Sequence, residues 1–414
     1  MNGQPERPAR IAAAFRSRFG AEPLVWCRAP GRVDLMGSHT DYNLGCVLTL
    51  PIDRDTWIAA RPRPDRIVQA HSLNLDADTR FDLDALARAP GRAWCNYLRG
   101  VASVLRADGQ SLCGFDAVLH STVPLGGGLS SSAALECATA TVFETLGGWS
   151  LDPVRKARLC QQAENEFVGV NCGILDQYTA CAGRAGCALL LDCRDLSAQP
   201  VQLARGLQVV IGDTRSKREL AGSEYGQRRA HCEAGARQFG VKALREVSLD
   251  RFRQHESALP ADVAKRCRFI LEEDERVLRM AEALTRGDTE AIGRLCTASF
   301  DGARRLYEIT TPAMHAMRDA MLQAPGVLGA RQAGAGFGGC LVAFVDPGAV
   351  DAFTAAVRRG YQDRTGTVPE LYPVHAVAGA GRVDGAMLGS GWSSRPSVEA
   401  GPGVGDGLPC QTAT

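Results

Sequence analysis

Three features are scarce or missing in this sequence: a charge imbalance, a long apolar run and paired cysteines. With 47 Lys plus Arg against 46 Asp plus Glu in 414 residues, the formal net charge is only +1. Proteins that bind nucleic acid usually carry a basic excess, so this balance argues against such a partner. No apolar run approaches the roughly 18–20 residues of a bilayer-spanning helix, which predicts a soluble chain with no membrane partner.

The fifteen cysteines do not form the pattern of a disulfide framework. They stand singly inside apolar segments such as CALLLDC (187–193), and no CxxC pair occurs. A structural zinc site is the sharper alternative, but no Cys/His pair has the spacing of zinc ligands. We therefore expect buried, reduced thiols in a cytoplasmic protein.

The N-terminal segment (1–20) is arginine-rich and amphipathic, with Ile11, Phe15 and Phe19 near one helical face. This composition is similar to that of an import signal, but Glu6 is atypical of one and a secretory apolar region is missing. An ordinary N-terminal helix is the preferred interpretation.

Strand and helix patterns alternate towards both ends of the chain, on either side of a long helical middle. Alternating or β-branched runs predict strands at 24–27, 47–60, 115–121, 189–193, 207–213, 327–331 and 340–345. A 3.6-residue period predicts helices at 94–107, 131–146, 151–170 and over most of 219–323. This order predicts an α+β fold with two lobes, 1–205 and 206–385. The Gly-, Ser- and Pro-rich end (386–414) predicts a disordered tail.

The turn VPLGGGLSSSAALE (123–136) combines glycines and serines between a predicted strand and a predicted helix. Glycines let the backbone approach a ligand, and the free N–H groups at a helix start favour an anion. It is not a Walker A loop, because no lysine follows the glycines. A flexible turn with serine caps is the plainer alternative. The full combination predicts a phosphate site made of Gly126, Gly127, Gly128, Leu129, Ser130, Ser131 and Ser132.

A phosphate site without a lysine needs positive charge from elsewhere, usually from a metal ion. The Ser132 hydroxyl and the Glu164 carboxylate are hard oxygen donors of the kind that Mg²⁺ prefers. On its own, Glu164 would be interpreted as a solvated acid on a helix face.

Two further segments gather polar groups that folding alone does not explain. GSHTDYNLG (37–45) crowds polar side chains between two glycines without any apolar periodicity, which indicates a loop that holds a small polar ligand. GVNCGILDQY (169–178) places Asp176 in an apolar stretch, where a carboxylate is costly unless it is paired. Asp176 could cap a helix; the alternative is a catalytic carboxylate whose direction is fixed by Arg32 of APGR.

A second glycine cluster, QAGAGFGGC (332–340), precedes a predicted strand. Such a cluster is often only a tight turn. In a nucleotide–sugar pocket between two lobes, it would pack its backbone closely over the phosphate loop.

Four segments, APGRVDLMGSHTDYNLGCVL, VPLGGGLSSSAALE, CGILDQY and AGAGFGGC, resemble in order the signatures of the galactokinases within the GHMP small-molecule kinases. WCNYLRGV (94–101) and DTRSKRELAGSEYGQRR (213–229) resemble two further galactokinase blocks. The resemblance implies a two-lobed GHMP kinase fold with the active site between the N- and C-terminal lobes. It also implies an ATP- and Mg²⁺-dependent sugar 1-kinase that phosphorylates galactose at the anomeric hydroxyl.

The resemblance assigns roles at the phosphate end of the site. Asp176 matches the catalytic base, and Arg32 matches the arginine that assists phosphoryl transfer. Ser132 and Glu164 match the magnesium ligands, while the glycine–serine loop matches the loop that binds the phosphates of ATP.

At the sugar end, His39, Asp41 and Tyr225 match positions that hold sugar hydroxyls, and Ser38 occupies another. The pattern usually has Glu at 38 and Asn where this chain has Asp34. That Glu is thought to bind the 6-hydroxyl, and losing a charge-assisted hydrogen bond costs roughly 1.5–3 kcal/mol. L-Arabinose, which lacks the hydroxymethyl group, and galacturonate, which carries a carboxylate there, therefore remain alternative substrates.

Two alternatives lie outside this reaction. A sensor that binds galactose and ATP without catalysis is disfavoured because the base and the serine loop are intact. A GHMP kinase for a non-sugar alcohol is disfavoured by SHTDYN and by Tyr225.

Overall fold

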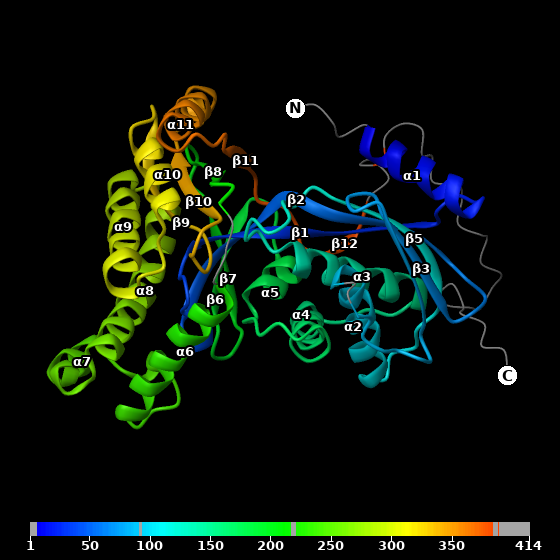
Figure 1. Cartoon of the computed structure of the whole chain (residues 1–414), viewed down its shortest axis with the longest axis horizontal. Helices are drawn as coiled ribbons and strands as arrows, with labels where there is room; N and C mark the ends of the chain where they lie inside the picture. Colours follow the sequence, from blue (N-terminus) through cyan, green and yellow to red (C-terminus); the bar gives the residue numbers. More distant parts are fainter. Residues whose placement is uncertain (1–5, 91–92, 217–220, 384–387, 389–414) are drawn as a thin grey trace.

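The structure is a computed structural model that describes residues 6–90, 93–216, 221–383 and 388 (Figure 1). It confirms the predicted α+β architecture with two lobes. One end of the elongated molecule holds a large sheet with its helices, and the other holds a smaller sheet covered by helices α8–α11. The predicted tail, 386–414, lies outside the described residues except for Leu388.

The larger sheet has eight strands, most of them in antiparallel pairs. They are β1 (Val25–Met36), β2 (Cys46–Pro62), β3 (Ile67–Ser72), β4 (Ala77–Asp82), β5 (Phe115–Ser121), β6 (Cys187–Asp192), β7 (Ala198–Gln202) and β12 (Gly381–Arg382). The order is β12-β1-β2-β5-β3-β4, and β6 with β7 joins the first half of the long β2. Only β3 and β5 pair in parallel among the described strands.

Different helices cover the two faces of this sheet, because side chains alternate along each strand. On one face, α1 (Glu6–Phe19) packs Ile11 and Phe15 against Trp26 and Trp57, as expected for an ordinary helix. The other face carries the larger core and is covered by α2 (Ala93–Ala107), α3 (Ser131–Gly147), α4 (Pro153–Gln162) and α5 (Leu175–Ala182).

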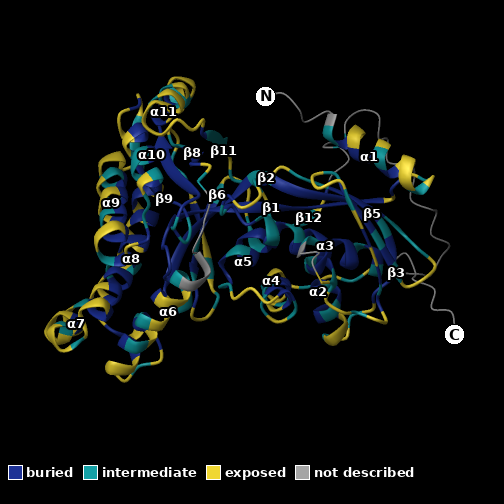
Figure 2. Cartoon of the chain, viewed as in Figure 1, coloured by how far each residue is buried: buried dark blue, intermediate teal, exposed yellow. Residues whose placement is uncertain are grey.

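The smaller sheet has the antiparallel order β11-β8-β10-β9. Its strands are β8 (Gln208–Asp213), β9 (Val327–Gln332), β10 (Cys340–Val345) and β11 (Glu370–Val374). The helices that contact this sheet are α9 (Thr289–Gly302), α10 (Pro312–Leu322) and α11 (Val350–Thr365). Next to α9 packs α8 (Ala261–Arg286), which in turn contacts α6 (Ala221–Gln238) and α7 (Leu249–His255). Figure 2 shows the faces of α8–α10 that turn to the strands as buried, and the outer faces as exposed.

Two local predictions differ from the structure in a way that matters for the site. The segment APGR, which follows the strand predicted at 24–27, continues β1, because β1 and β2 stay paired through two shifts of register. The helix expected at 151–170 ends at Gln162 as α-helix and continues as a π-helical turn, Ala163–Val168. Its start is as expected, with Asp152 accepting from the N–H of Val154 at 2.9 Å.

All of the described cysteines except Cys172 and Cys187 are buried, as the sequence predicted. Among the residues that the structure covers, no helix has both the length and the apolarity needed to cross a bilayer.

Candidate active site

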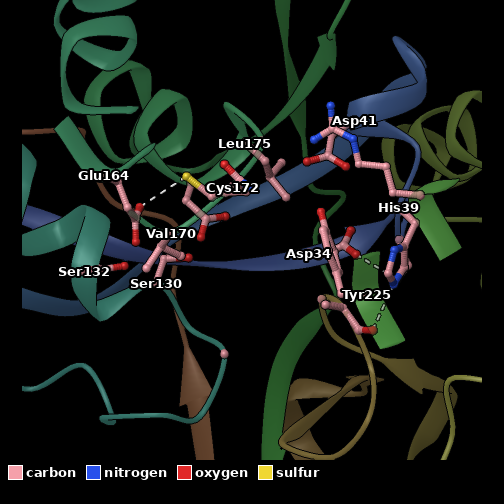
Figure 3. Close-up of a pocket in the computed structure, with 18 of the residues that line it drawn as sticks. Asp34, His39, Asp41, Ser130, Ser132, Glu164, Val170, Cys172, Leu175 and Tyr225 are labelled. Atoms are coloured by element: carbon pink, nitrogen blue, oxygen red, sulfur yellow. Dashed lines mark hydrogen bonds between the residues drawn. The ribbon is translucent and has the colours of Figure 1, made fainter. Parts of the chain in front are cut away.

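A cavity of about 1000 Å³ lies where the two lobes meet (Figure 3). Five separate stretches of the chain contribute to its wall, within 32–41, 126–132, 164–176, 225–233 and 334–335. Every site residue predicted from the sequence except Gly127 and Leu129 lines it. In Figure 3, Ser132 and Glu164 lie at one end, and Asp34, His39 and Tyr225 at the other. The fold thus brings together segments that are far apart in the sequence.

Arg32 of β1 connects two other parts of the cavity wall, Asp176 and the glycine–serine loop. Its Nε and Nη2 both donate to Oδ1 of Asp176, at 2.9 and 2.6 Å, and its Nη1 donates to the carbonyl of Gly128 at 2.7 Å. The Arg32 side chain is 9% exposed and that of Asp176 is 23% exposed, so the pair lies in the cavity wall but remains accessible. Asp176 Oδ2 accepts no hydrogen bond from the described residues and is available to a ligand.

The phosphate loop is held against β1 by the backbone. Arg32 N–H donates to the carbonyl of Leu129 at 3.2 Å, and a Cβ on Gly31 would lie only 2.6 Å from that oxygen. Gly126 and Gly128 have φ of 73° and 80°, the left-handed region in which glycine is favoured. This backbone explains why the loop needs its glycines.

The loop leads into the N-terminus of α3, a helix long enough to carry a substantial dipole. Ser130 precedes the helix with φ of 63°, and its buried hydroxyl has no partner among the described residues. The first N–H groups of α3 and the hydroxyls of Ser131 and Ser132 border the cavity. An anionic group is the ligand that this arrangement favours.

Glu164 stands in the π-helical turn, opposite Ser132. Its Oε2 accepts from Gln177 Nε2 at 2.6 Å and from the Cys172 thiol at 3.3 Å. Burial raises the pKa of Glu164, with the charge of Asp176 adding to the rise, and hydrogen bonds from Cys172, Ser132 and Gln177 oppose it. A π turn re-aims the residues that follow it, and such turns recur at functional sites.

A second buried acid lies behind Glu164. The amide nitrogen of Gln177 donates to Glu136 Oε2 at 3.0 Å as well as to Glu164, so it joins the two carboxyl groups. Burial, and then the charge of Glu164, raises the pKa of Glu136 well above its usual range. Gln177 and Glu136 were not predicted as site residues from the sequence. Their signal was a polar residue inside each of two apolar helical segments.

At the end of the cavity opposite Ser132 and Glu164, His39 is held by the protein itself. Its Nε2 donates to the carbonyl of Ala335 at 2.9 Å, and its Nδ1 accepts from the Tyr42 hydroxyl at 2.9 Å. Burial lowers the pKa of His39 to about 4, so the ring is neutral. The ring packs beside Tyr225, with centroids 5.1 Å apart. Both ring nitrogens therefore have protein partners, and the ring shapes the wall of the cavity.

Asp41 reaches the cavity over Gly173. A Cβ on Gly173 would lie 1.9 Å from Asp41 Oδ2, so only glycine lets the two segments approach this closely. Burial raises the pKa of Asp41 to about 6, and the nearby charges of Asp176 and Asp34 act in the same direction. Gly173 was not singled out in the sequence, because its role depends on a contact with a distant segment.

The second glycine cluster packs beside the phosphate loop, as predicted. A Cβ on Gly334 would lie 3.8 Å from the carbonyl oxygen of Gly128. The neighbouring Ala335 supplies the carbonyl that accepts from His39. The loop after β9 therefore contacts both ends of the cavity.

Ser38 and Asp34 lie side by side at the same end of the cavity as His39. Ser38 Oγ donates to Asp34 Oδ2 at 3.0 Å and accepts from Nη2 of the buried Arg331 at 2.9 Å. Burial raises the pKa of Asp34, while the charges of Arg331 and Arg32 lower it. The sequence analysis noted Asp34 as a departure from a pattern but did not predict its contact with Ser38.

Family models match most of the chain in three parts. Residues 13–62 match the galactokinase galactose-binding signature, 96–184 the N-terminal domain of GHMP kinases, and 280–363 the GHMP kinase C-terminal domain. The first range includes β1 with Arg32 and the loop 37–45, and the second includes the phosphate loop and Asp176.

Named proteins of known sequence or structure agree with these matches. The chain is 44% identical to galactokinase of Chloroflexus aggregans over 376 residues, which is 90% of this chain and 96% of that protein. Galactokinase of a Roseiflexus species is 43% identical over 89% and 95%, respectively. The crystal structure of Lactococcus lactis galactokinase complexed with galactose superposes with a TM-score of 0.86, at 32% identity, over 91% of this chain and 99% of that one. Methanococcus jannaschii mevalonate kinase, at 16% identity and a TM-score of 0.62, shares the fold.

Proposed function

The chain belongs to the galactokinase family of the GHMP kinases, and we propose that it transfers the γ-phosphoryl group of ATP to the anomeric hydroxyl of galactose. The product would be galactose 1-phosphate. The observation that carries the proposal is Arg32, which hydrogen-bonds Asp176 and the phosphate loop at once. A nucleophile held by Asp176 and a phosphate held by the loop would therefore meet at Arg32.

In this mechanism Asp176 acts on the hydroxyl that attacks phosphorus. Because Arg32 occupies Oδ1, Oδ2 is free to accept the proton of the anomeric hydroxyl and to aim its oxygen. Phosphoryl transfer requires mainly positioning and charge stabilisation. The Arg32 guanidinium and the N–H groups at the start of α3 supply positive potential where charge moves from the γ-phosphate to the leaving oxygen.

The residues at the loop end fit a magnesium ion. Ser132 and Glu164 face each other there and offer hard oxygen donors, and the loop carries no lysine. When bound, Mg²⁺ would neutralise charge on the phosphates of ATP. Gln177 fixes the direction of Glu164 through the hydrogen bond to Oε2. A cytoplasmic location, where thiols stay reduced, agrees with the free cysteines.

The sugar would occupy the opposite end of the cavity. Asp41 is a carboxylate there that can accept from sugar hydroxyls, and Tyr225 lines the same wall from α6. His39 and Tyr225 present ring surface, on which the apolar side of a hexose packs. We assign substrate binding to Ser38, His39, Asp41 and Tyr225, with His39 contributing shape.

A panel of acceptors tests the proposal directly. ADP release would be measured with ATP, Mg²⁺ and galactose, glucose, L-arabinose, galacturonate or mevalonate. We expect the highest kcat/KM with galactose and only background ADP release without a sugar. Binding of galactose and ATP without turnover would identify a sensor instead, and a preference for another acceptor would reassign the substrate.

A further inference from the structure

Asp34 lies on the face of β1 that also carries Arg32. It lies two residues after Arg32, and residues i and i+2 of a strand point to the same face. The register of β1 on β2 shifts just after Asp34, between Asp34 and Met36. Such irregularities turn side chains towards active sites. Asp34 accordingly lines the same cavity as Arg32 and His39 (Figure 3).

One oxygen of Asp34 is committed and the other is not. Oδ2 accepts from Ser38 Oγ at 3.0 Å and lies 3.7 Å from Arg331 Nη1. Oδ1 is buried and has no hydrogen-bond partner among the described residues. The Asp34 side chain is only 1% exposed, and an unsatisfied carboxylate oxygen at such a position is costly. A ligand hydroxyl in the cavity would satisfy it.

Asp34 lies beside a buried cluster of charged side chains. Arg331 is fully buried and pairs with Glu273 at 2.9 Å, and Glu273 also pairs with Arg276 at 2.7 Å. Two guanidinium groups thus share Glu273, and Arg276 also pairs with Glu272 at 3.4 Å. Asp34 lies 3.7 Å from Arg331 and places further negative charge beside it. An acid at the adjoining position 38 would also lie beside Arg331, because Ser38 Oγ accepts from Arg331 Nη2 at 2.9 Å.

We propose that Asp34 is the carboxylate that selects the sugar in this chain, in place of an acid at 38. The proposal rests on the proposed function, because it concerns the galactose site. Asp34 Oδ1 accepts a hydrogen bond from the 6-hydroxyl, and Ser38 holds Oδ2 in place. The acid is relocated by four residues, so the site still prefers galactose to L-arabinose, which lacks that hydroxyl. The same carboxylate repels galacturonate.

A comparison of four proteins tests whether the acid has moved from position 38 to position 34. The proteins are wild type, Asp34→Asn, Ser38→Glu and the double variant. Each would be assayed for kcat/KM with galactose and with L-arabinose, for KM of ATP, and for melting temperature. We expect Asp34→Asn to lower the galactose-to-arabinose ratio of kcat/KM by about tenfold or more, because a charge-assisted hydrogen bond is lost. Ser38→Glu alone places two acids together and should lower both this ratio and the melting temperature.

The double variant moves the acid back to 38 while keeping one carboxylate beside Arg331. It should recover the ratio to within about threefold of wild type, together with most of the melting temperature, so the two substitutions are strongly non-additive. The KM of ATP should change less than about twofold in all four proteins, since the ATP end of the cavity is untouched.

Two additional variants separate specificity from folding. Glu144→Gln disrupts another buried ion pair, with Lys156, far from the sugar end, and should lower the melting temperature without changing the sugar ratio. Ser38→Ala removes the hydroxyl that donates to Asp34 and accepts from Arg331, and it should lower the ratio a few-fold in a folded protein.

An unchanged sugar ratio in both Asp34→Asn and Ser38→Ala would overturn the inference, and so would losses that simply add in the double variant. If Asp34→Asn does not fold, the Ser38→Ala ratio and the double variant decide. A wild type that releases no ADP with galactose would overturn the proposed function itself and the inference with it. A wild type active on galactose whose variants keep its ratio would overturn the inference alone.

Discussion

Asp176 and Arg32 form a pair in which one carboxylate oxygen is bound and the other is free. Asp176→Asn keeps the shape of the side chain but removes the base and the charge. We expect turnover with galactose to fall at least about a hundredfold, while galactose and ATP still bind. Single-turnover kinetics and calorimetric titration would measure the two effects separately.

A matched control for this substitution is Asp116→Asn. Asp116 also pairs with an arginine, Arg63 at 2.7 Å, but away from the cavity, so kcat should remain within about twofold of wild type. If Asp176→Asn kept more than about a tenth of wild-type turnover, a loss below roughly 1.4 kcal/mol, Asp176 would not be the base.

Glu164 faces Ser132 at the end of the cavity where phosphate charge would accumulate. Glu164→Gln replaces a carboxylate by a neutral amide, which is a weaker ligand for a hard cation. We expect the Mg²⁺ concentration for half-maximal rate to rise about tenfold or more, and a magnesium titration at saturating ATP would measure it. Glu166→Gln, an exposed neighbour in the same turn, is the control. An identical titration curve for the two variants would remove Glu164 from the metal site.

β1 meets the phosphate loop through backbone contacts at Gly31. Gly31→Ala would place a Cβ 2.6 Å from the carbonyl oxygen of Leu129, so the loop must move away from the strand. We expect KM for ATP to rise about tenfold, with an overpacking cost of about 1–3 kcal/mol in the free energy of unfolding. KM for galactose should change much less.

Steady-state kinetics on both substrates and a denaturant titration would measure these effects. Gly381→Ala in β12 is the control, because a Cβ there meets nothing within 4 Å and the φ angle is ordinary. Equal KM values for ATP in the two alanine variants would mean that the contact between Gly31 and the loop does not position ATP.

At the scale of elements, local sequence signals predicted the helices with clear caps and the strands with clear alternation. The 3.6-residue period of 151–170 marked α4, and the alternation of FDAVLHS marked β5. The continuation of β1 through APGR had no such signal. That segment is extended because β2 pairs with it across two register shifts, which is a tertiary effect. The short β3 and β4 were missed for the same reason.

The site was predictable where one short segment carries the chemistry, and not where distant segments meet. The glycine–serine loop and Asp176 could be recognised locally, and the structure places both in one cavity. The hydrogen bonds of Gln177 to Glu136 and Glu164, and of Ser38 to Asp34 and Arg331, depend on the folded packing. No pattern within one segment could predict them.

The molecule encloses several acids between its lobes. Burial of one of them, Asp41, lowers the free energy of unfolding at neutral pH. Burial, aided by the charges of Asp176 and Asp34, raises the pKa of Asp41 to about 6. In the unfolded chain an aspartate titrates near 3.9. Between about pH 4 and 6 the folded protein therefore binds a proton that the unfolded chain has released. The free energy of unfolding accordingly falls as the pH rises through this window and becomes level above it.

Asp41→Asn removes this titration. Relative to wild type and without sugar, the variant should gain stability as the pH rises from 4 to 7, by on the order of 2–3 kcal/mol.

His39, whose pKa burial lowers to about 4, acts with the opposite sign, because its contribution to stability is lost as the pH falls from about 6.5. His39 is present in both proteins, so its effect cancels in the difference. Asp108→Asn is the control: hydrogen bonds from Gln110 and Arg155 lower the pKa of Asp108, so its titration falls below about pH 4 and the difference in stability from wild type should stay nearly constant between pH 4.5 and 8. Denaturant titrations at pH 4.5, 6 and 8 would measure both differences. A constant difference between Asp41→Asn and wild type at all three pH values would show that the Asp41 carboxylate is not destabilised by burial between the lobes.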